Sequence, residues 1–241
     1  MALVTGAAAE TGREIALRLA AGGALVVVAD IDRRAAEDTV DQIEVAGGHA
    51  AAIAADVTKD DDVRRMIGFA GRDGGGPHVL VNNAGGWGPA NYPEAAPEQW
   101  SATLDLNLRA AMLATQLALE PMKTAGGGVV VNVASTAGLG SDPYASPDYG
   151  AAKAGLIRFT TTLGDLGERM NVRVNCIVPD WIATDRAHGE LERMTAAERR
   201  EAGPLVPMAD VAAAVIAFVN VERMAGRVVV LRGGKPRRFL P

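Results

Sequence analysis

Internal disulfides, base-stacking surfaces and basic faces all find little support in this sequence. Only one cysteine, Cys176, is present among 241 residues, so no internal disulfide can form, which is typical of a reducing compartment. Aromatic residues make up 4% of the chain, which argues against a platform that stacks on bases. The 24 lysines and arginines face 29 aspartates and glutamates, and the net charge of −5 argues against nucleic acid or an anionic membrane as the main partner.

Targeting, membrane and metal-binding patterns are not evident either. The chain opens MALVTGAAAE, without the basic start and the apolar stretch of a signal peptide. The longest uncharged runs, Gly74–Pro93 and Thr124–Ser141, are interrupted by glycine, proline or polar residues, so neither predicts a membrane span. We therefore expect a cytoplasmic protein with no membrane partner, no nucleic-acid partner and no metal.

The composition that remains, 49% apolar over 241 residues, fits one folded domain. Short apolar runs alternate with helix-like segments, and because the runs are nearly continuous they predict strands buried on both faces of a parallel sheet. The predicted strands are Ala2–Thr5, Ala24–Ala29, Ala50–Ala54, His78–Val81, Val129–Val133, Val172–Ile177 and Arg227–Leu231. The predicted helices lie near 12–22, 33–46, 59–70, 98–124, 149–169 and 208–220. Residues 1–241 are thus predicted to form a single α/β domain with a doubly wound, seven-stranded sheet flanked by helices.

One charged segment, from Arg186 to Pro204, interrupts this alternation after the sixth strand. It predicts a short helix over Glu190–Glu201 and, at 186–203, a lid over a substrate site. A solvated surface helix is the alternative.

The first strand runs directly into Thr5-Gly6-Ala7-Ala8-Ala9-Glu10-Thr11-Gly12, which a helix follows. The free N–H groups and positive dipole end of that helix suit a pyrophosphate, and small residues let the backbone approach it. Thr11 and Glu14 form a T-x-x-E pattern that predicts a capping box at the helix start. A purely structural turn is the alternative.

Asp30 ends the second strand, 18 residues after Gly12. A carboxylate here can accept hydrogen bonds from the 2′- and 3′-hydroxyls of an adenosine ribose, and it repels a 2′-phosphate. This predicts NAD in preference to NADP in a Rossmann-type domain. Alternatively, Asp30 only opens the next turn, as Asp32 also can.

Further polar residues follow the third, fourth and fifth strands, where ligands bind in open α/β sheets. They are Asp56 and Val57, then Asn82, Asn83, Ala84 and Gly85, then Ser135. Each set could also form turns only. Tyr149 comes fourteen residues after Ser135, and Tyr149 and Lys153 are spaced i, i+4, so they share one helical face. A free phenol has a pKa near 10, and a nearby ammonium lowers that pKa, which suits an acid/base.

In this order the motifs resemble the short-chain dehydrogenase/reductase family, from Leu3 to Gly234. The resemblance extends through Arg173-Val174-Asn175-Cys176-Ile177-Val178-Pro179, then Ile182-Ala183-Thr184, to a last strand before Gly233-Gly234. It implies hydride transfer between a nicotinamide cofactor and an alcohol or carbonyl substrate. It also implies a homo-oligomer, a tetramer or a dimer, through the helices at 98–124 and 149–169.

The resemblance further implies residue roles. Tyr149 is the acid/base, Lys153 holds the nicotinamide ribose and lowers the Tyr149 pKa, Ser135 bonds the substrate oxygen, and Asn107 anchors a water leading to Lys153. Asn107 could instead be an ordinary polar helix residue, Ser135 a turn residue, and Thr136 is a lesser candidate. The implied cofactor-binding residues are Gly6, Ala9, Thr11, Gly12, Asp30, Asp56, Val57, Asn82, Asn83, Ala84, Gly85, Tyr149, Lys153, Pro179, Ile182 and Thr184.

Two positions depart from the family pattern, because Glu10 and Asp180 stand where glycine is usual. Glu10 either faces the pyrophosphate, which its charge opposes, or points into solvent, and glutamate tolerates the positive φ of such a turn poorly. Asp180 either faces substrate or caps a turn. Trp87, Trp181 and Met194 either line an apolar substrate pocket or only pack.

Glu10 also supports an alternative function, a degenerate member that binds dinucleotide weakly and senses or scaffolds. A methyltransferase with a glycine-rich first turn is a second alternative. It gives no reason for Ser135, Tyr149 and Lys153 to occur in register.

Overall fold

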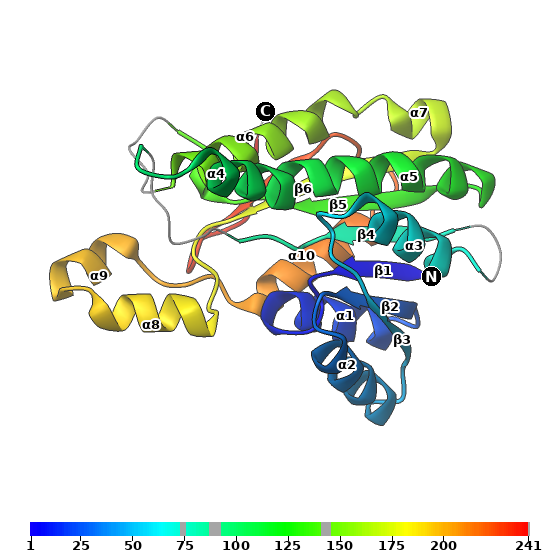
Figure 1. Cartoon of the computed structure of the whole chain (residues 1–241), viewed down its shortest axis with the longest axis horizontal. Coiled ribbons are helices and arrows are strands. Elements are labelled where there is room, and N and C mark those ends of the chain that lie inside the picture. Colours follow the sequence, from blue (N-terminus) through cyan, green and yellow to red (C-terminus); the bar gives the residue numbers. More distant parts are fainter. Residues whose placement is uncertain (73–75, 87–92, 141–145, 241) are drawn as a thin grey trace.

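One central sheet organises the structure (Figure 1), and the carboxyl ends of its strands position the site. The structure is a computed structural model, and it describes residues 1–72, 76–86, 93–140 and 146–240. Within them the sheet has eight strands in the order β3-β2-β1-β4-β5-β6-β7-β8. The strands are β1 (Ala2–Thr5), β2 (Leu25–Asp30), β3 (His49–Ala54), β4 (Val79–Asn82), β5 (Gly128–Val133), β6 (Val172–Pro179), β7 (Val228–Leu231) and β8 (Arg238–Phe239). The predicted doubly wound α/β fold is confirmed.

Helices connect the strands and cover both faces of the sheet (Figure 1). They are α1 (Glu10–Ala21), α2 (Arg33–Val45), α3 (Asp60–Ala70), α4 (Pro97–Leu104), α5 (Ala110–Thr124), α6 (Pro147–Thr162), α7 (Leu166–Met170), α8 (Asp185–Arg193), α9 (Ala196–Ala202) and α10 (Met208–Asn220). A π-helical turn, η1 (Asp105–Arg109), joins α4 to α5, and a 3₁₀ turn, η2 (Thr136–Gly138), follows β5. None of the described helices is long and apolar enough to cross a membrane.

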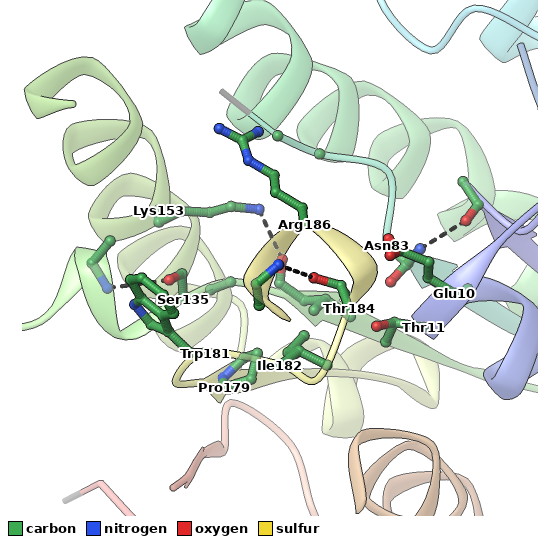
Figure 2. Close-up of a pocket in the computed structure, with 18 of the residues that line it drawn as sticks. Glu10, Thr11, Asn83, Ser135, Lys153, Pro179, Trp181, Ile182, Thr184 and Arg186 are labelled. Atoms are coloured by element: carbon green, nitrogen blue, oxygen red, sulfur yellow. Dashed lines mark hydrogen bonds between the residues drawn. The ribbon is translucent and has the colours of Figure 1, made fainter. Parts of the chain in front are cut away.

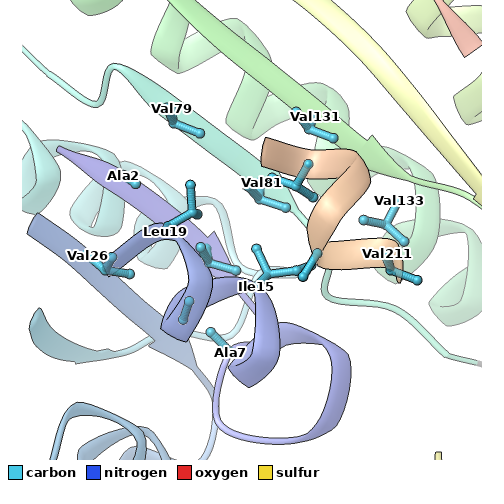
Figure 3. Close-up of a cluster of buried hydrophobic side chains, with 14 of the residues drawn as sticks. Ala2, Ala7, Ile15, Leu19, Val26, Val79, Val81, Val131, Val133 and Val211 are labelled. Atoms are coloured by element: carbon cyan, nitrogen blue, oxygen red, sulfur yellow. The ribbon is translucent and has the colours of Figure 1, made fainter. Parts of the chain in front are cut away.

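Alternating side chains of the strands build two buried layers, because successive residues of a strand point to opposite faces. On one face, Val26, Val81 and Val131 belong to a cluster with side chains of α1, α2 and α10. Figure 3 shows these three valines with Ile15 and Leu19 of α1 and Val211 of α10. On the other face, Leu3 and Leu80 pack with α3 and α5. This burial on both faces explains why the strand sequences are continuous apolar runs.

Several predicted boundaries are wrong in detail. The predicted helix at 98–124 is divided by η1, and the one at 149–169 ends at Thr162 before α7 begins. Strand β8, which is antiparallel to β7, was not predicted. It has only two residues, both exposed, so it carries no apolar run.

The predicted Thr11–Glu14 capping box is also wrong. Helix α1 begins at Glu10 after Ala9, whose side chain has no polar atom, so Thr11 lies inside the helix. Glu14 instead accepts a hydrogen bond from Arg18 Nε at 2.9 Å.

The segment after β6 forms two helices rather than the single predicted helix over Glu190–Glu201. Helix α8 ends at Arg193, and α9 starts after Thr195, which forms a capping box with Glu198. Figure 1 shows both helices standing away from the sheet, beyond its carboxyl ends. The base of the segment is held by a bridge between Ile182 and Val206.

Candidate active site

A cavity of about 750 Å³ opens at the carboxyl ends of the strands. Its lining includes residues after β1 and β4, between which the sheet order changes direction, and in α/β sheets this is the usual ligand position. Figure 2 shows Glu10 and Thr11 at one end, Ser135 and Trp181 at the other, and Thr184 and Arg186 between them. The predicted site residues that line it are Gly6, Ala9, Thr11, Gly12, Asp30, Asn83, Ala84, Gly85, Ser135, Tyr149, Lys153, Pro179, Ile182 and Thr184.

The first turn is packed so closely that two of its positions need glycine. A Cβ on Gly12 would lie 1.9 Å from the carbonyl oxygen of Gly6, and Gly6 itself has a φ of +62°. Asn83 fixes this turn to β4, because its Nδ2 donates to the carbonyl oxygens of Thr5 at 3.1 Å and Gly6 at 3.0 Å. The start of α1 therefore faces the cavity as a rigid, small-residue cradle.

Asp30 and Asp32 have different positions, although either could open a turn. Asp32 caps α2, since its Oδ1 accepts from the backbone N–H of Ala35 at 3.1 Å. Asp30 lines the cavity, and its Oδ2 accepts from the N–H of Ala8 at 3.0 Å. The Asp30 carboxylate is thereby held against the first turn, with lone pairs left for further donors.

Ser135 and its neighbour Thr136 are distinguished by their partners. The Thr136 hydroxyl donates to Asp180 Oδ1 at 3.0 Å, so its proton is engaged. Among the described residues, the bond found at Ser135 Oγ is the one it accepts from the N–H of Ala137 at 3.2 Å, and there the hydroxyl proton can donate to a ligand oxygen. Asp180 also accepts from the N–H of Trp181 at 3.1 Å, so it caps a turn while lining the cavity.

Tyr149 and Lys153 lie on the same face of α6 and both line the cavity. The Lys153 Nζ is 5.4 Å from the centre of the Tyr149 ring and donates to the carbonyl oxygen of Val133 at 3.0 Å. Burial lowers the pKa of Lys153 to about 8, because the apolar surroundings disfavour its charge. The ammonium is still the main form at pH 7.

Asn107 lies in η1, just behind the cavity wall, and holds the chain after β4 in place. Its Nδ2 donates to the carbonyl oxygens of Gly86 at 2.6 Å and Thr103 at 2.9 Å, and its Oδ1 accepts from the N–H of Gly86 at 3.0 Å. A Cβ on Gly85 would lie 2.8 Å from Asn107 Oδ1 and 3.1 Å from Lys153 Nζ. The amide and the ammonium thus converge on Gly85, which has room only for glycine.

Four predicted site residues do not line the described part of the cavity: Asp56, Val57, Asn82 and Asn107. Asp56 instead stabilises the turn after β3 by accepting from the backbone N–H of Thr58 at 2.9 Å. Asn82 is buried beneath the site, where its Nδ2 donates to Asn132 Oδ1 at 2.8 Å. Asn132 in turn donates to Thr160 Oγ1 at 2.9 Å, so this chain of amides joins β4, β5 and α6.

The cavity also includes residues that sequence reasoning missed or left open. Trp181 lines it, whereas Met194 directly follows α8 and is not among its described lining; Trp87 lies outside the described residues. Missed lining residues are Gly86, Val133, Ala134, Ala137 and Ser146, whereas Arg186, Ala187 and Glu190 belong to the segment 186–203 that is predicted to be a lid. Arg186 Nε donates to Glu190 Oε1 at 2.9 Å across one turn of α8. The i, i+4 spacing of Arg186 and Glu190 could have indicated that both lie on one helix. It was overlooked because the helix was predicted to start only at Glu190.

Glu10 faces the cavity rather than pointing away from it. Its backbone keeps the positive φ of the turn, at +45°, which is unusual for a residue other than glycine. Its Oε1 accepts from the backbone N–H of Asp185 at 2.9 Å, the first residue of α8.

Comparison with known proteins decides the family. A profile described as short chain dehydrogenase matches residues 1–195. The 7alpha-hydroxysteroid dehydrogenase of Escherichia coli strain K12 is 36% identical over 185 residues, 76% of this chain and 71% of that protein. The chain belongs to the short-chain dehydrogenase/reductase family.

Two further short-chain dehydrogenase/reductase relatives agree with this assignment. The D-beta-hydroxybutyrate dehydrogenase of Cupriavidus necator is 36% identical over 194 residues, 79% of this chain and 74% of that protein. A solved 7 alpha-hydroxysteroid dehydrogenase, in complex with NADH and 7-oxo glycochenodeoxycholic acid, superposes with a TM-score of 0.87 at 31% identity, covering 97% of this chain and 92% of that one. This chain is accordingly an NAD(P)-dependent oxidoreductase acting on alcohol and carbonyl groups.

Proposed function

We propose that this enzyme uses NAD(H) in preference to NADP(H) and interconverts a secondary alcohol and a ketone. The observation that carries the proposal is that Ser135, Tyr149 and Lys153 line the same cavity as Asp30 and the first turn. This single cavity joins a group that can hold an adenosine ribose to a group that can move a proton.

The residues present fit a dinucleotide. The first turn offers a cradle that a Cβ at Gly12 would fill, and the N-terminus of α1 favours a diphosphate. Asp30 would accept bonds from the adenosine ribose hydroxyls, and Lys153 would hold the second ribose. Pro179, Ile182 and Thr184 would border the nicotinamide end. Hydride exchange is the chemistry that the nicotinamide ring supplies when the cofactor is bound.

The chain's own residues manage the proton on the substrate oxygen. In reduction, Tyr149 gives its phenolic proton to the carbonyl oxygen, and in oxidation the phenolate takes the proton from the alcohol. Lys153 stabilises the phenolate by its charge, and Ser135 orients the substrate oxygen with its hydroxyl proton. Asn107, buried beside Lys153, anchors a water through which Tyr149 and Lys153 regain a proton.

Names of relatives guide the substrate class. The names of the hydroxysteroid and hydroxybutyrate dehydrogenases both refer to substrates that are secondary alcohols. Substrate contacts in this chain are proposed for Trp181 and Asp180, which line the cavity beside Ser135, with residues 186–203 as a lid. We also propose a cytoplasmic homo-oligomer, supported by the single cysteine and by the family resemblance.

The test is a panel of secondary alcohols with NAD⁺ and of ketones with NADH, followed by absorbance of the reduced cofactor. We expect turnover of at least one pair. We expect Tyr149→Phe to lower kcat for that pair by at least 10²–10⁴-fold, because acid/base help is lost, with cofactor affinity within a few-fold. Near-normal turnover by the Phe variant would remove Tyr149 from the mechanism.

A further inference from the structure

Two helix N-termini meet at the cavity, and Glu10 connects them. Helix α1 begins at Glu10, and α8 begins at Asp185, 175 positions later in the chain. The Glu10 Oε1 accepts the backbone N–H of Asp185 at 2.9 Å. A side chain of the dinucleotide turn is thus bonded to the first residue of the segment proposed as a lid.

This bond completes the cap of α8. Thr184 Oγ1 accepts from the N–H of Ala187 at 3.2 Å, and Glu10 satisfies the N–H of Asp185, one of the N–H groups without a partner inside the helix. The carboxylate also places negative charge at the positive end of the helix dipole. Both effects stabilise the position of α8 next to α1.

Other connections of this segment lie at its base. The Val206 N–H donates to the carbonyl oxygen of Trp181 at 2.7 Å, and the Ala183 N–H donates to that of Val206 at 2.9 Å. These bonds fix where the segment leaves and rejoins the sheet, whereas α8 and α9 stand away from it (Figure 1). The Glu10 bond therefore adds a further connection at the first residue of α8, two residues beyond the Ala183 bond, where α8 leaves this base.

The Glu10 carboxylate lies at the N-terminus of α1, where the diphosphate of the proposed cofactor is also expected to bind. Glu10, Thr11, Thr184 and Arg186 line one stretch of the cavity (Figure 2). The N-terminus of α1 is where a diphosphate is favoured, and a diphosphate repels a carboxylate at short range. Both anions cannot hold this position together at low cost.

We propose that Glu10 is a lid-positioning residue whose carboxylate holds α8 against the dinucleotide turn in the free enzyme and is displaced by the diphosphate of the cofactor. This rests on the proposed cofactor site. Because the Asp185–Glu10 bond exists only in the free enzyme, it stabilises that state alone. The bond therefore lowers cofactor affinity while keeping the lid in place before the cofactor arrives.

The first measurement concerns the free protein. Amide hydrogen exchange over residues 184–190 is compared in wild type, Glu10→Gly and Glu10→Gln, with Glu14→Gln as the matched control. Glu14 carries the same charge on the same helix but pairs with Arg18, and it is not among the described residues lining the cavity. We expect faster exchange in Glu10→Gly, a smaller increase in Glu10→Gln, and no change in the control. Equal exchange in all four proteins would overturn the proposal.

The second measurement uses ADP, NADH and adenosine as ligands, with affinity measured by calorimetry or fluorescence. We expect both Glu10 variants to bind ADP and NADH more tightly, on the order of tenfold, which corresponds to about 1.4 kcal/mol. Adenosine lacks the diphosphate, so its affinity should not change, which also controls for relief of the positive φ at Glu10. Unchanged or weaker ADP binding in the Glu10 variants would contradict the inference alone. A wild type that binds neither ADP nor NADH would contradict the proposed function.

Discussion

At the scale of single residues, hydrogen-bond partners distinguish site residues from neighbours of similar chemistry. Asp30 and Asp32 are alike in sequence, but only Asp30 lines the cavity while Asp32 caps α2. Ser135 and Thr136 are adjacent hydroxyls, yet Asp180 engages the Thr136 proton. The bonds that place Asp30 and engage Thr136 join them to Ala8 and Asp180, which are distant in the chain, so they are not readable from the local sequence.

Cofactor preference is predicted to depend on the charge of Asp30. We expect wild type to bind NAD(H) more tightly than NADP(H), because the carboxylate repels a 2′-phosphate by at most about 4 kcal/mol at 4 Å. Asp30→Ala should narrow that ratio. Since Asp30 also accepts from the Ala8 N–H, both affinities should fall, so the ratio from titrations is the informative quantity. Asp30→Asn removes the charge but keeps an oxygen that can accept the Ala8 N–H, so it controls for the loss of that hydrogen bond. A wild type that binds NADP more tightly than NAD would contradict the assignment of Asp30.

Burial of the Lys153 ammonium is predicted to lower the free energy of unfolding. Its pKa is about 8 in the folded protein, against an ordinary 10.5, because of burial. At this group the unfolded chain therefore binds more protons than the folded protein between these pH values, so the contribution of Lys153 to the free energy of unfolding rises with pH across that window. Below pH 8 the full penalty is present, roughly 3 kcal/mol.

Lys153→Met should therefore raise the free energy of unfolding at pH 7 while abolishing turnover. The gain should be below roughly 3 kcal/mol, because the carbonyl of Val133 loses its donor. Denaturant unfolding at pH 7 and pH 10 measures it, and the difference from wild type should shrink at the higher pH. A variant that is less stable at pH 7, or a difference independent of pH, would show that Lys153 is not penalised by burial.

At the scale of elements, the apolar runs predicted the strands well because burial on both sheet faces leaves a plain signal. The failures have physical reasons. Strand β8 is two exposed residues, Arg238 and Phe239, and the turn η1 differs from an α-helix only in its hydrogen bonding. The break before α9 did have a signal, since Thr195 and Glu198 have the capping-box spacing.

The helix starts show why the same motif misled at α1. Thr11 and Glu14 have the same spacing, but α1 begins earlier, at Glu10, so Thr11 lies inside the helix and not at its N-cap. Much of the site, including Ser135, Tyr149, Lys153 and the first turn, was predictable because short motifs carry it. The bond between Glu10 and Asp185 was not, because it joins residues 175 positions apart.

Lid motion is the prediction that belongs to α8 and α9. In the free enzyme we expect residues 186–203 to exchange amide hydrogens faster than the buried strands, since the two helices stand apart from the sheet (Figure 1). With NAD(H) and substrate bound, exchange should slow by about tenfold or more, as lids close over substrates. Hydrogen-exchange mass spectrometry with and without ligands measures this. Protection equal to that of β4 and β5 in both states would make the segment an ordinary surface helix pair.

At the scale of the whole molecule, α8 and α9 stand beyond the carboxyl ends of the strands, and the helices α4, α5 and α6 cover the opposite sheet face from α1 and α2 (Figure 1). Lid movement and association of subunits can therefore use different surfaces. On α5, Met112 is 41% exposed, a large apolar side chain within the helix region through which the family resemblance implies assembly.

The last prediction concerns that assembly. We expect the wild type to sediment at two or four times 24.9 kDa. Met112→Glu should shift the protein toward the monomer, because an unpaired carboxylate in a closed interface costs several kcal/mol, which weakens association on the order of a hundredfold. Val45→Glu is the matched control, since Val45 is 90% exposed at the end of α2, on the other side of the sheet. Sedimentation velocity over a range of concentrations separates the three proteins. A monomeric wild type would contradict the predicted assembly, and a Met112→Glu variant that associates as tightly as Val45→Glu would place the subunit contacts elsewhere than α5.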